Sequence, residues 1–381
     1  MYLENIALQN FRNYELAELS FSASINVLIG ENAQGKTNLI ESIYFLAMSR
    51  SHRTARDREL IRWDSEFAKV NGKLKKRSHS VPMEIILSKR GKIAKLNHLE
   101  QKKLSNYIGQ LNVILFAPED LSLVKGSPSV RRKFIDMELG QMNKIYLHHL
   151  AQYQQILKQR NQFLKQAKYD PKFDQIYLDV LTEQLAAEGA EVLFYRFKFI
   201  KQLNAWAQQV QIDISNDKEQ LEIRYKTISE ITDELSVEEI FEQLKENYQS
   251  SQQQEIDQGT TTLGPHRDDL IFYVNDRNVQ TYGSQGQQRT TALSLKLAEI
   301  ELMNEVTGEY PILLLDDVLS ELDDSRQTHL LNSIQNKVQT FITTTSLDGV
   351  QMELLNDPLI FYVDGGTATN QTAEQEEDTH S

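Results

Sequence analysis

The sequence predicts an α/β fold into which a long α-helical region is inserted. Apolar runs at residues 25–29, 312–315 and 340–343 have the composition of strands that are buried on both faces of a sheet. Residues 37–48 and 287–306 instead repeat apolar side chains at helical spacing, so strands and helices alternate near both ends of the chain. Residues 131–210 are rich in Gln, Lys, Leu and Tyr and contain one proline, which favours long antiparallel helices.

The remaining segments complete this outline. The first residues alternate apolar and polar side chains as a strand does, and residues 67–70, 83–87 and 113–116 predict a mostly antiparallel lobe with a helix near residues 102–108. Residues 270–274 predict a further strand. Within the helical region, Leu147, Leu150, Leu157 and Leu164 occupy heptad-compatible positions, which fits either a coiled coil or an ordinary helical bundle.

These patterns predict four regions. The first part of an α/β head spans residues 1–126, a helical arm spans 127–255, and the second part of the head spans 256–365. Residues 366–381 are polar and acidic and predict a disordered tail.

Composition restricts the class of protein. The chain has 381 residues and no cysteine, and it shows neither a signal peptide nor an apolar run long enough for a membrane span, so we expect a cytoplasmic protein without membrane contact. The net charge of −13 argues against a protein that coats nucleic acid over its whole surface.

The charge is unevenly distributed, however. Residues 50–133 contain 20 Lys and Arg against 8 Asp and Glu. This basic segment fits either contact with DNA phosphates or a solvated lysine-rich surface. Its densest clusters supply the candidate DNA contacts, which are Lys73, Lys75, Lys76, Arg77, Arg131 and Arg132.

A phosphate-binding loop follows the first apolar run. Its eight residues are Gly30, Glu31, Asn32, Ala33, Gln34, Gly35, Lys36 and Thr37. They match the pattern G-x-x-x-x-G-K-[ST] between a strand and a helix, where glycine lets backbone N–H groups face phosphates at a helix N-terminus. We expect Lys36 to contact the β- and γ-phosphates of ATP and the Thr37 hydroxyl to bind Mg²⁺.

A pair of carboxylates directly follows the apolar run at residues 312–315. Asp316 is expected to bind Mg²⁺ as a Walker B residue, and Asp317 to orient or deprotonate the attacking water. Together with the phosphate-binding loop, this pair predicts a nucleoside triphosphatase.

Two further motifs indicate which class of nucleoside triphosphatase this is. Ser284-Gln285-Gly286-Gln287-Gln288 precedes a helix and is similar to the signature motif of ABC-type ATPases, and residues 320–323 are similar to their D-loop. In that class the signature of one subunit closes over the γ-phosphate bound by the other, so Ser284, Gly286 and Gln287 are candidate ATP contacts. A hydroxyl, backbone N–H groups and a helix N-terminus suit that task.

The chain as a whole resembles the RecF family of bacterial recombination mediators, which is related to the SMC ATPases. The resemblance is carried by the motifs above together with residues 10–14, 49–54, 118–121, 127–136, 264–270 and 315–323, in order along residues 1–365. It implies an ABC-type head with a helical arm, ATP-dependent homodimerisation and DNA binding, at duplexes or at single-strand/duplex junctions. It also implies slow, DNA-stimulated ATPase activity and work with RecO and RecR to load RecA during repair, replication restart and the SOS response to DNA damage.

For several residues that match the family, more than one role is consistent with the sequence. Arg12 and Asn13 match positions near the nucleotide base and α-phosphate of SMC-like heads, although a structural arginine at a strand end also fits. Arg50 and Arg53 fit contact with either the γ-phosphate or DNA. We interpret His266 as structural.

The sequence also departs from the ABC pattern at three positions. Asp317 replaces the usual catalytic glutamate, residues 117–120 contain no Q-loop glutamine, and residues 343–345 provide only threonines at the switch position. These changes are consistent with slow ATP hydrolysis that limits how long the ATP-bound state lasts.

Two other functions compete with this interpretation. An ABC-type ATPase that controls a different DNA effector, such as a nuclease, would need a carboxylate-rich metal site beyond the head, and the residues after Ile342 are too few for one. A P-loop kinase that acts on a small metabolite is the other alternative, but that function requires neither the signature motif nor the D-loop motif.

Overall fold

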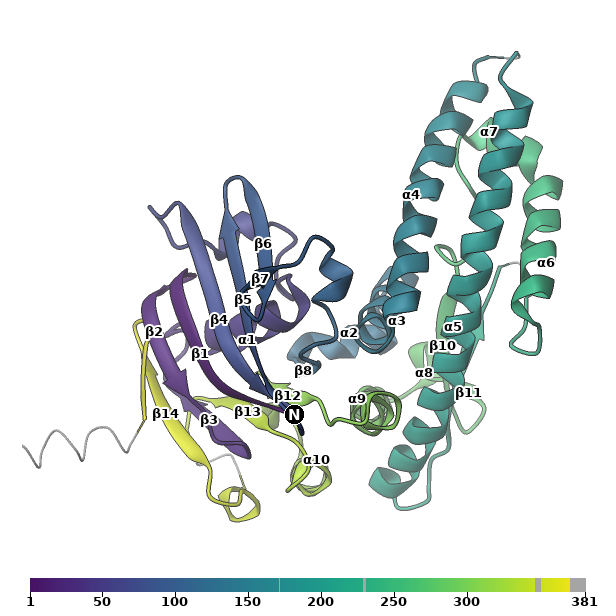
Figure 1. Cartoon of the computed structure of the whole chain (residues 1–381). Helices are drawn as coiled ribbons and strands as arrows, with labels where there is room; N and C mark the ends of the chain where they lie inside the picture. The colour runs from purple at the N-terminus through teal and green to yellow at the C-terminus, as the bar shows by residue number, and fades with distance from the viewer. Residues whose placement is uncertain (171, 229–230, 347–350, 371–381) are drawn as a thin grey trace, which may run out of the picture. The chain divides into compact units, whose positions relative to one another are not determined.

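The structure, a computed structural model, describes residues 1–170, 172–228, 231–346 and 351–370. The chain divides into two compact units (Figure 1). The head unit comprises Met1–Asp120 and Lys296–Ser381, and the arm unit comprises Leu121–Leu295. The α/β fold with an inserted helical arm that the sequence predicts is thereby confirmed.

The head unit contains an antiparallel sheet with the strand order β2-β1-β4-β5-β6-β7. Its strands are β1 (Tyr2–Phe11), β2 (Tyr14–Ser20), β4 (Phe67–Lys75), β5 (Ser80–Ser88), β6 (Gly91–Leu96) and β7 (Leu99–Glu100). Buried and partly exposed side chains alternate along β4 and β5, as expected for a sheet with one face on the core. This sheet is the antiparallel lobe that the sequence predicts.

The second sheet of the head unit has the order β15-β14-β3-β13-β12-β8. Its strands are β3 (Ile25–Ile29), β8 (Val113–Phe116), β12 (Ile312–Leu315), β13 (Thr340–Thr344), β14 (Leu359–Asp364) and β15 (Thr367–Asn370). The apolar runs predicted to be buried strands are β3, β13 and β12, and they pair in parallel. The run at β8 was expected in the antiparallel lobe, but it pairs in parallel with β12.

Helix α1 (Lys36–Met48) joins the two sheets, since it contacts β1, β4 and β5 of one and β8 and β13 of the other. Eleven of its 13 residues are buried. A helix that is buried nearly all round must be covered by other elements on several sides. The start of α1, which carries Lys36 and Thr37, is therefore fixed by the core of the head unit.

Short elements complete the head unit. They are η1 (Asp57–Leu60), η2 (Leu104–Asn106), η3 (Pro118–Asp120), η4 (Leu319–Glu321), α10 (Asp324–Ile334) and η5 (Met352–Leu354). The helix expected near residues 102–108 is only the single 3-10 turn η2.

Three long helices form most of the arm unit, and Figure 1 shows α4, α5 and α6 running alongside one another. The helices of this unit are α2 (Leu121–Lys125), α3 (Pro128–Met142), α4 (Lys144–Ala167), α5 (Gln175–Ser215), α6 (Val237–Ser250), α7 (Gln252–Gln258) and α8 (Val279–Tyr282). Side chains fix where they begin: Asn143 caps α4, Asp174 caps α5, and Ser236 and Glu239 form a capping box on α6.

The arm unit is longer than the predicted arm of residues 127–255. Strand β10 (Asp269–Val274), which we expected in the head, pairs with β9 (Leu221–Lys226) and β11 (Arg277–Asn278) in a separate three-stranded sheet. The first part of α9 (Gln285–Thr307), up to Leu295, also falls in the arm unit. Alternation identified β10 as a strand, but alternation does not specify a strand's partner.

The first residues of the predicted disordered tail form a strand instead. Residues 367–370 form β15, which pairs with β14 through a turn that contains Gly365 and Gly366. The rest of the predicted tail, residues 371–381, lies outside the described residues. Within the described part of the chain, no helix is long and apolar enough to cross a membrane.

Candidate functional site: a phosphate-binding loop beside two carboxylates

The phosphate-binding loop joins β3 to α1, and its glycines are required by close backbone contacts. Gly35 precedes α1 at φ 126°, where a Cβ atom would lie 2.7 Å from the amide nitrogen of Asn13. A Cβ atom on Gly30 would lie 2.3 Å from the carbonyl oxygen of Val363 in β14. Any larger side chain at either position would therefore displace the loop.

Lys36 is only 4% exposed, but its charged end makes polar contacts and does not pack in the apolar core. Its ammonium group donates to the carbonyl oxygens of Gly30 and Glu31, at 2.6 and 2.9 Å. These contacts hold the positive charge inside the curve of the loop, where the phosphates of a nucleotide would bind.

Two segments distant in sequence brace the loop from outside. Asn13 donates to the carbonyl oxygen of Gln34 and accepts from the side chain of Asn38, at 2.9 and 2.8 Å. The backbone N–H groups of Gly365 and Gly366 donate to the side chain and the carbonyl of Gln34, at 2.8 and 3.0 Å. Sequence patterns did not identify the glycine pair as part of the site, although two adjacent glycines after a strand indicate an unusual backbone.

Arg12 forms a structural ion pair. Its guanidinium binds both carboxylate oxygens of Glu41 at 2.8 Å and the carbonyl of Glu59 at 2.9 Å. Burial opposes ionisation of Glu41, but hydrogen bonds from Arg12 and Ser51 and the charge of Arg12 lower its pKa overall. Of the two roles left open for Arg12, this geometry supports the structural one, whereas Asn13 directly contacts the phosphate-binding loop.

The two predicted metal ligands lie together. Asp316 follows β12, and its Oδ1 accepts hydrogen bonds at 3.0 Å from the hydroxyls of Thr37 and Thr343. Burial raises the pKa of Asp316, with a smaller contribution from the charge of Asp317. A cation next to Asp316 would offset this cost, and a hydroxyl beside a carboxylate is a suitable oxygen pair for Mg²⁺.

Asp317 and Asp316 are linked through Thr343 of β13. The Thr343 hydroxyl accepts from the Asp317 N–H at 2.8 Å and lies 3.5 Å from its carboxylate. Asp317 has φ 54°, in the left-handed region, so the extended backbone of β12 does not continue through it. The sequence places Thr343 at the switch position without a role, and the structure shows that it positions both carboxylates.

Of the two arginines with open roles, Arg53 lies beside the first turn of α1. Its Nη1 donates to the side chain of Asn38 at 3.0 Å and is 3.8 Å from Glu41. Asn38 in turn contacts Asn13. This position is compatible with both of the roles left open for Arg53.

The signature string belongs to the arm unit. Ser284 accepts at its hydroxyl from the N–H of Gln287 at 3.2 Å, and the Gln287 side chain accepts from the N–H of Ser284 at 3.0 Å. This reciprocal capping arrangement fixes the N-terminus of α9. Ser284 is exposed and Gly286 partly so, which leaves this helix end accessible to another molecule.

The candidate DNA contacts separate into two groups. Lys73, Lys75, Lys76 and Arg77 occupy the end of β4 and the turn after it, where all four are at least partly exposed. Lys73 pairs with Glu4 at 2.9 Å, and Lys76 donates to Gln110 at 3.3 Å.

The structure corrects the interpretation of Arg131. This side chain is 2% exposed and binds both oxygens of Asp269, at 2.7 and 2.9 Å, so it is not available to phosphates. Arg132 is partly buried and donates to the carbonyl of Asp268 at 2.7 Å. Both arginines connect α3 to the start of β10, Arg131 at Asp269 and Arg132 at the preceding Asp268. A charge cluster in sequence does not reveal such burial.

His266 belongs to the same buried network of the arm unit. Its Nδ1 and the hydroxyl of Tyr153 are 2.6 Å apart, and burial lowers the pKa of His266 to about 4. The histidine is therefore neutral at pH 7 and fits the structural role that we expected.

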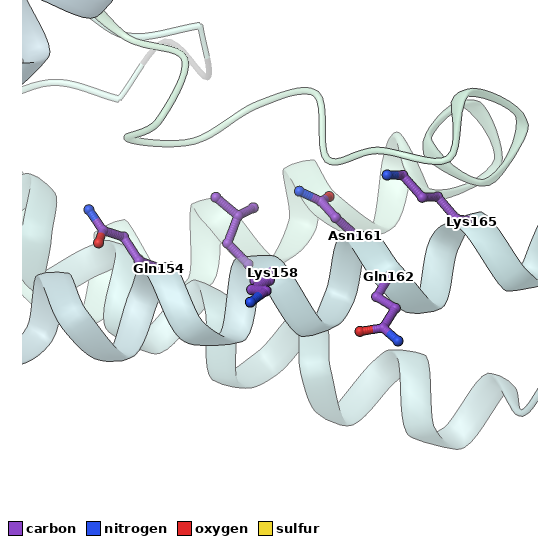
Figure 2. Close-up of a pocket in the computed structure, with 6 residues that line it drawn as sticks. Gln154, Lys158, Asn161, Gln162 and Lys165 are labelled. Atoms are coloured by element: carbon purple, nitrogen blue, oxygen red, sulfur yellow. The ribbon is translucent and has the colours of Figure 1, made fainter. Parts of the chain in front are cut away.

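An open groove of about 550 Å³ runs along the outer face of α4 (Figure 2). It is lined by Gln154, Leu157, Lys158, Asn161, Gln162 and Lys165. Small-molecule sites are usually enclosed, mostly apolar and lined by several elements. This groove is lined by one polar helix face, so it does not compete with the phosphate-binding loop as a nucleotide site.

Comparison with known proteins is consistent with this site. The family model of the RecF/RecN/SMC N terminal domain matches residues 2–363. The DNA replication and repair protein RecF of Pediococcus pentosaceus is 60% identical over 374 residues, which cover 98% of this chain and all of that protein. The protein of the same name from Bacillus subtilis is 56% identical over 366 residues, covering 96% and 99%.

Solved structures agree. A structure of the recombination mediator protein RecF with ATP, in the RecFOR pathway, has a TM-score of 0.88 at 35% identity, covering 97% of this chain and 99% of that one. The Smc head domain of Pyrococcus furiosus has a TM-score of 0.55 at 16% identity, which shows a shared fold alone. The chain belongs to the RecF family, with the ABC-type ATPase head that this family shares with the SMC proteins.

Proposed function

We propose that this protein is an ATP-dependent DNA-binding switch of recombinational repair and replication restart. Two copies bind ATP between them and close on DNA, and hydrolysis opens them again. The observation that carries this proposal is the contact between Thr37 and Asp316, which joins the phosphate-binding loop to the Walker B strand. The names of the relatives, which include DNA repair, ATP and the RecFOR pathway, support the same function.

Each residue of the site has a defined task in this proposal. Lys36 and the backbone of residues 30–35 bind the phosphates of ATP, and Asn13 holds the loop in shape. Thr37 and Asp316 would hold Mg²⁺, which neutralises phosphate charge when it is bound. Asp317 orients or deprotonates the attacking water.

The exposed position of the signature motif supports the proposed dimerisation. Ser284, Gly286 and Gln287 form an exposed helix N-terminus, which suits the γ-phosphate of an ATP molecule bound by a second copy. These contacts exist only in the dimer, so ATP shifts the equilibrium towards it. Measurement of self-association with and without ATP tests this proposal, and a monomer that stays unchanged at saturating ATP would exclude it.

The finer features of the function follow the RecF family. We propose slow, DNA-stimulated hydrolysis in the bacterial cytoplasm, binding to duplexes and single-strand/duplex junctions, and joint action with RecO and RecR to load RecA. The alternative is control of a different DNA effector, such as a nuclease. Within the described residues no group of three or more His, Cys, Asp or Glu side chains could hold a metal ion.

Asp317→Asn is expected to preserve ATP binding and dimerisation but to lower the turnover number by about 10²-fold, because loss of a base spares ground-state binding. Asparagine also tolerates the positive φ of this position. Single-turnover ATP hydrolysis measures the effect. Asp276→Asn is the matched control, since it makes the same chemical change at φ 62° on the exposed surface of the arm unit. Equal turnover in the two variants would place the catalytic base elsewhere.

The basic end of β4 is expected to contact DNA phosphates. Replacing both Lys75 and Arg77 with glutamine should weaken duplex binding and reduce the slope of log affinity against log salt by about two units, roughly one for each phosphate that is no longer neutralised. Titrations of labelled duplex at several salt concentrations measure the slope. Lys218→Gln, on the exposed surface of the arm unit, controls for net charge. A slope that matches this control would show that the cluster is an ordinary solvated surface.

A further inference from the structure

Trp63 is exposed to an unusual degree. It is 91% exposed, although an indole ring is the largest apolar side chain and is usually largely buried. Among the described residues, it has no ring-stacking or cation–π partner. The nucleotide site described above does not use it.

The chain presents this ring on a firm support. Trp63 stands in a tight turn, closed by a hydrogen bond of 3.1 Å from the N–H of Ser65 to the carbonyl of Arg62. Before the turn, Ile61 forms a β-bridge with Phe11, and the N–H of Arg62 donates to the carbonyl of Asn10 at 2.9 Å. The backbone that carries the ring is therefore held in place at the end of β1, and little ordering of this backbone would be needed to bind a partner.

Cationic side chains precede the turn in sequence, whereas the acidic residues Asp64 and Glu66 follow Trp63. Residues 50–63 contain five arginines and two acidic residues, and Lys92 pairs with one of these, Asp57, at 2.9 Å. Arg56 is 85% exposed, and its ion pair with Glu59 is a long one of 3.9 Å. Arg58 is also exposed, and no ion pair in the described part of the chain involves it.

An exposed aromatic ring on the same segment as exposed guanidinium groups matches the chemistry of a nucleic-acid strand. Bases stack on aromatic side chains, and arginines bind the phosphates that link them. The base of bound ATP fits less well, because its phosphates occupy the loop around Lys36 and cannot also bind Arg56 and Arg58. A paired base fits less well too, since its faces are covered inside the duplex.

We propose that Trp63 stacks on an unpaired base of DNA while Arg56 and Arg58 contact the neighbouring phosphates. This inference rests on the proposed DNA-binding function and specifies its substrate, because a stacking residue recognises the single-stranded side of a junction. A duplex bound elsewhere on the head unit, at the basic end of β4, would supply the other side.

Tryptophan fluorescence provides a direct test, since the chain has only two tryptophans. Trp206→Phe makes Trp63 the sole reporter in the full chain. With a non-hydrolysable ATP analogue present, we expect single-stranded and gapped DNA to quench this fluorescence and blunt duplex to leave it unchanged. Anisotropy of a dye on the DNA reports binding in the same samples, independently of stacking.

Affinity measurements provide the second arm of the test. Trp63→Ala should weaken binding of gapped DNA about 5- to 150-fold, as for loss of one stacked base, while Trp63→Phe keeps most of the affinity. Tyr169→Ala, which removes another highly exposed aromatic ring in the arm unit, should have no effect. DNA-independent ATP hydrolysis should be the same in all three variants.

Three results would contradict the inference without contradicting DNA binding. The first is DNA binding, reported by anisotropy, that neither quenches Trp63 fluorescence nor is weakened by Trp63→Ala. The second is equal quenching by blunt duplex, and the third is quenching by the nucleotide alone. The first would be the result expected of a protein-docking residue, and the third would assign the ring to the base of ATP. Absence of any DNA-dependent anisotropy change would instead refute the proposed function, and this inference with it.

Discussion

Lys36→Ala is expected to abolish tight ATP binding and ATP-induced dimerisation while leaving the protein folded. The ammonium group donates only to the carbonyl oxygens of Gly30 and Glu31, so its removal disturbs the loop and not the apolar core. A hydrogen bond to a charged group contributes about 1.5–3 kcal/mol, so removal of even one phosphate contact of this kind weakens binding by about 10- to 150-fold. Removal of two such contacts would exceed that range.

Isothermal titration with ATP measures this effect, and thermal unfolding separates it from misfolding. Without nucleotide, the melting temperature of Lys36→Ala should match that of the unmodified protein. With nucleotide, only the unmodified protein should gain stability, because a ligand that binds the native state alone stabilises it. Lys158→Ala, at an exposed lysine of α4, is the control. If Lys36→Ala still dimerised with ATP as the unmodified protein does, the phosphate-binding loop would not be the switch.

The central elements of the site could be predicted because local sequence determines them. A glycine-rich loop between an apolar strand and a helix, and a carboxylate pair at the end of another apolar strand, have few alternative structures. Parallel pairing of β3, β13 and β12 then brings Thr37 to within 3.0 Å of Asp316, although the two residues are 279 positions apart.

Other features depend on tertiary pairing, which residue patterns do not show. Strand β10 alternates as expected, but its partner is β9 in the arm unit. The turn at Gly365 and Gly366 resembles the start of a polar tail, yet its backbone N–H groups bind Gln34. Thr343 has no assigned role in the sequence because a lone threonine has no signature, and only the pairing of β12 with β13 places it beside both aspartates.

Arg131 shows the limit of charge patterns most clearly. Arg131, Arg132 and Lys133 form one of the densest basic clusters of the sequence, which suggests a phosphate-binding surface. The helical periodicity of α3 turns Arg131 inward, where it pairs with Asp269 from a segment 138 positions away. Arginine is well suited to such buried bidentate pairs, so a cluster of positive charge predicts a surface only when burial is known.

The central claim is that two copies of the chain build each ATP site, and a mixture of two inactive variants tests it most directly. In a two-fold dimer, each site would combine Lys36 of one copy with Ser284 of the other. Lys36→Ala removes phosphate binding and Ser284→Arg blocks closure, so either variant alone should be inactive in both sites. A mixed dimer would carry both changes in one site and neither in the other.

The measurement is the ATPase rate of the two purified variants mixed in equal amounts. With random exchange about half of the dimers are mixed and each has one intact site, so we expect roughly a quarter of the unmodified activity to return. A quarter is the value for random pairing of independent sites. Because neither variant alone is expected to dimerise on ATP, mixed dimers should be enriched, and the recovered activity should lie between a quarter and a half. If each site were made within one chain, every chain would be defective and no activity could return. Mixed dimers that form, as shown by differently tagged copies, but remain inactive would contradict the shared site and the role of Ser284 in it.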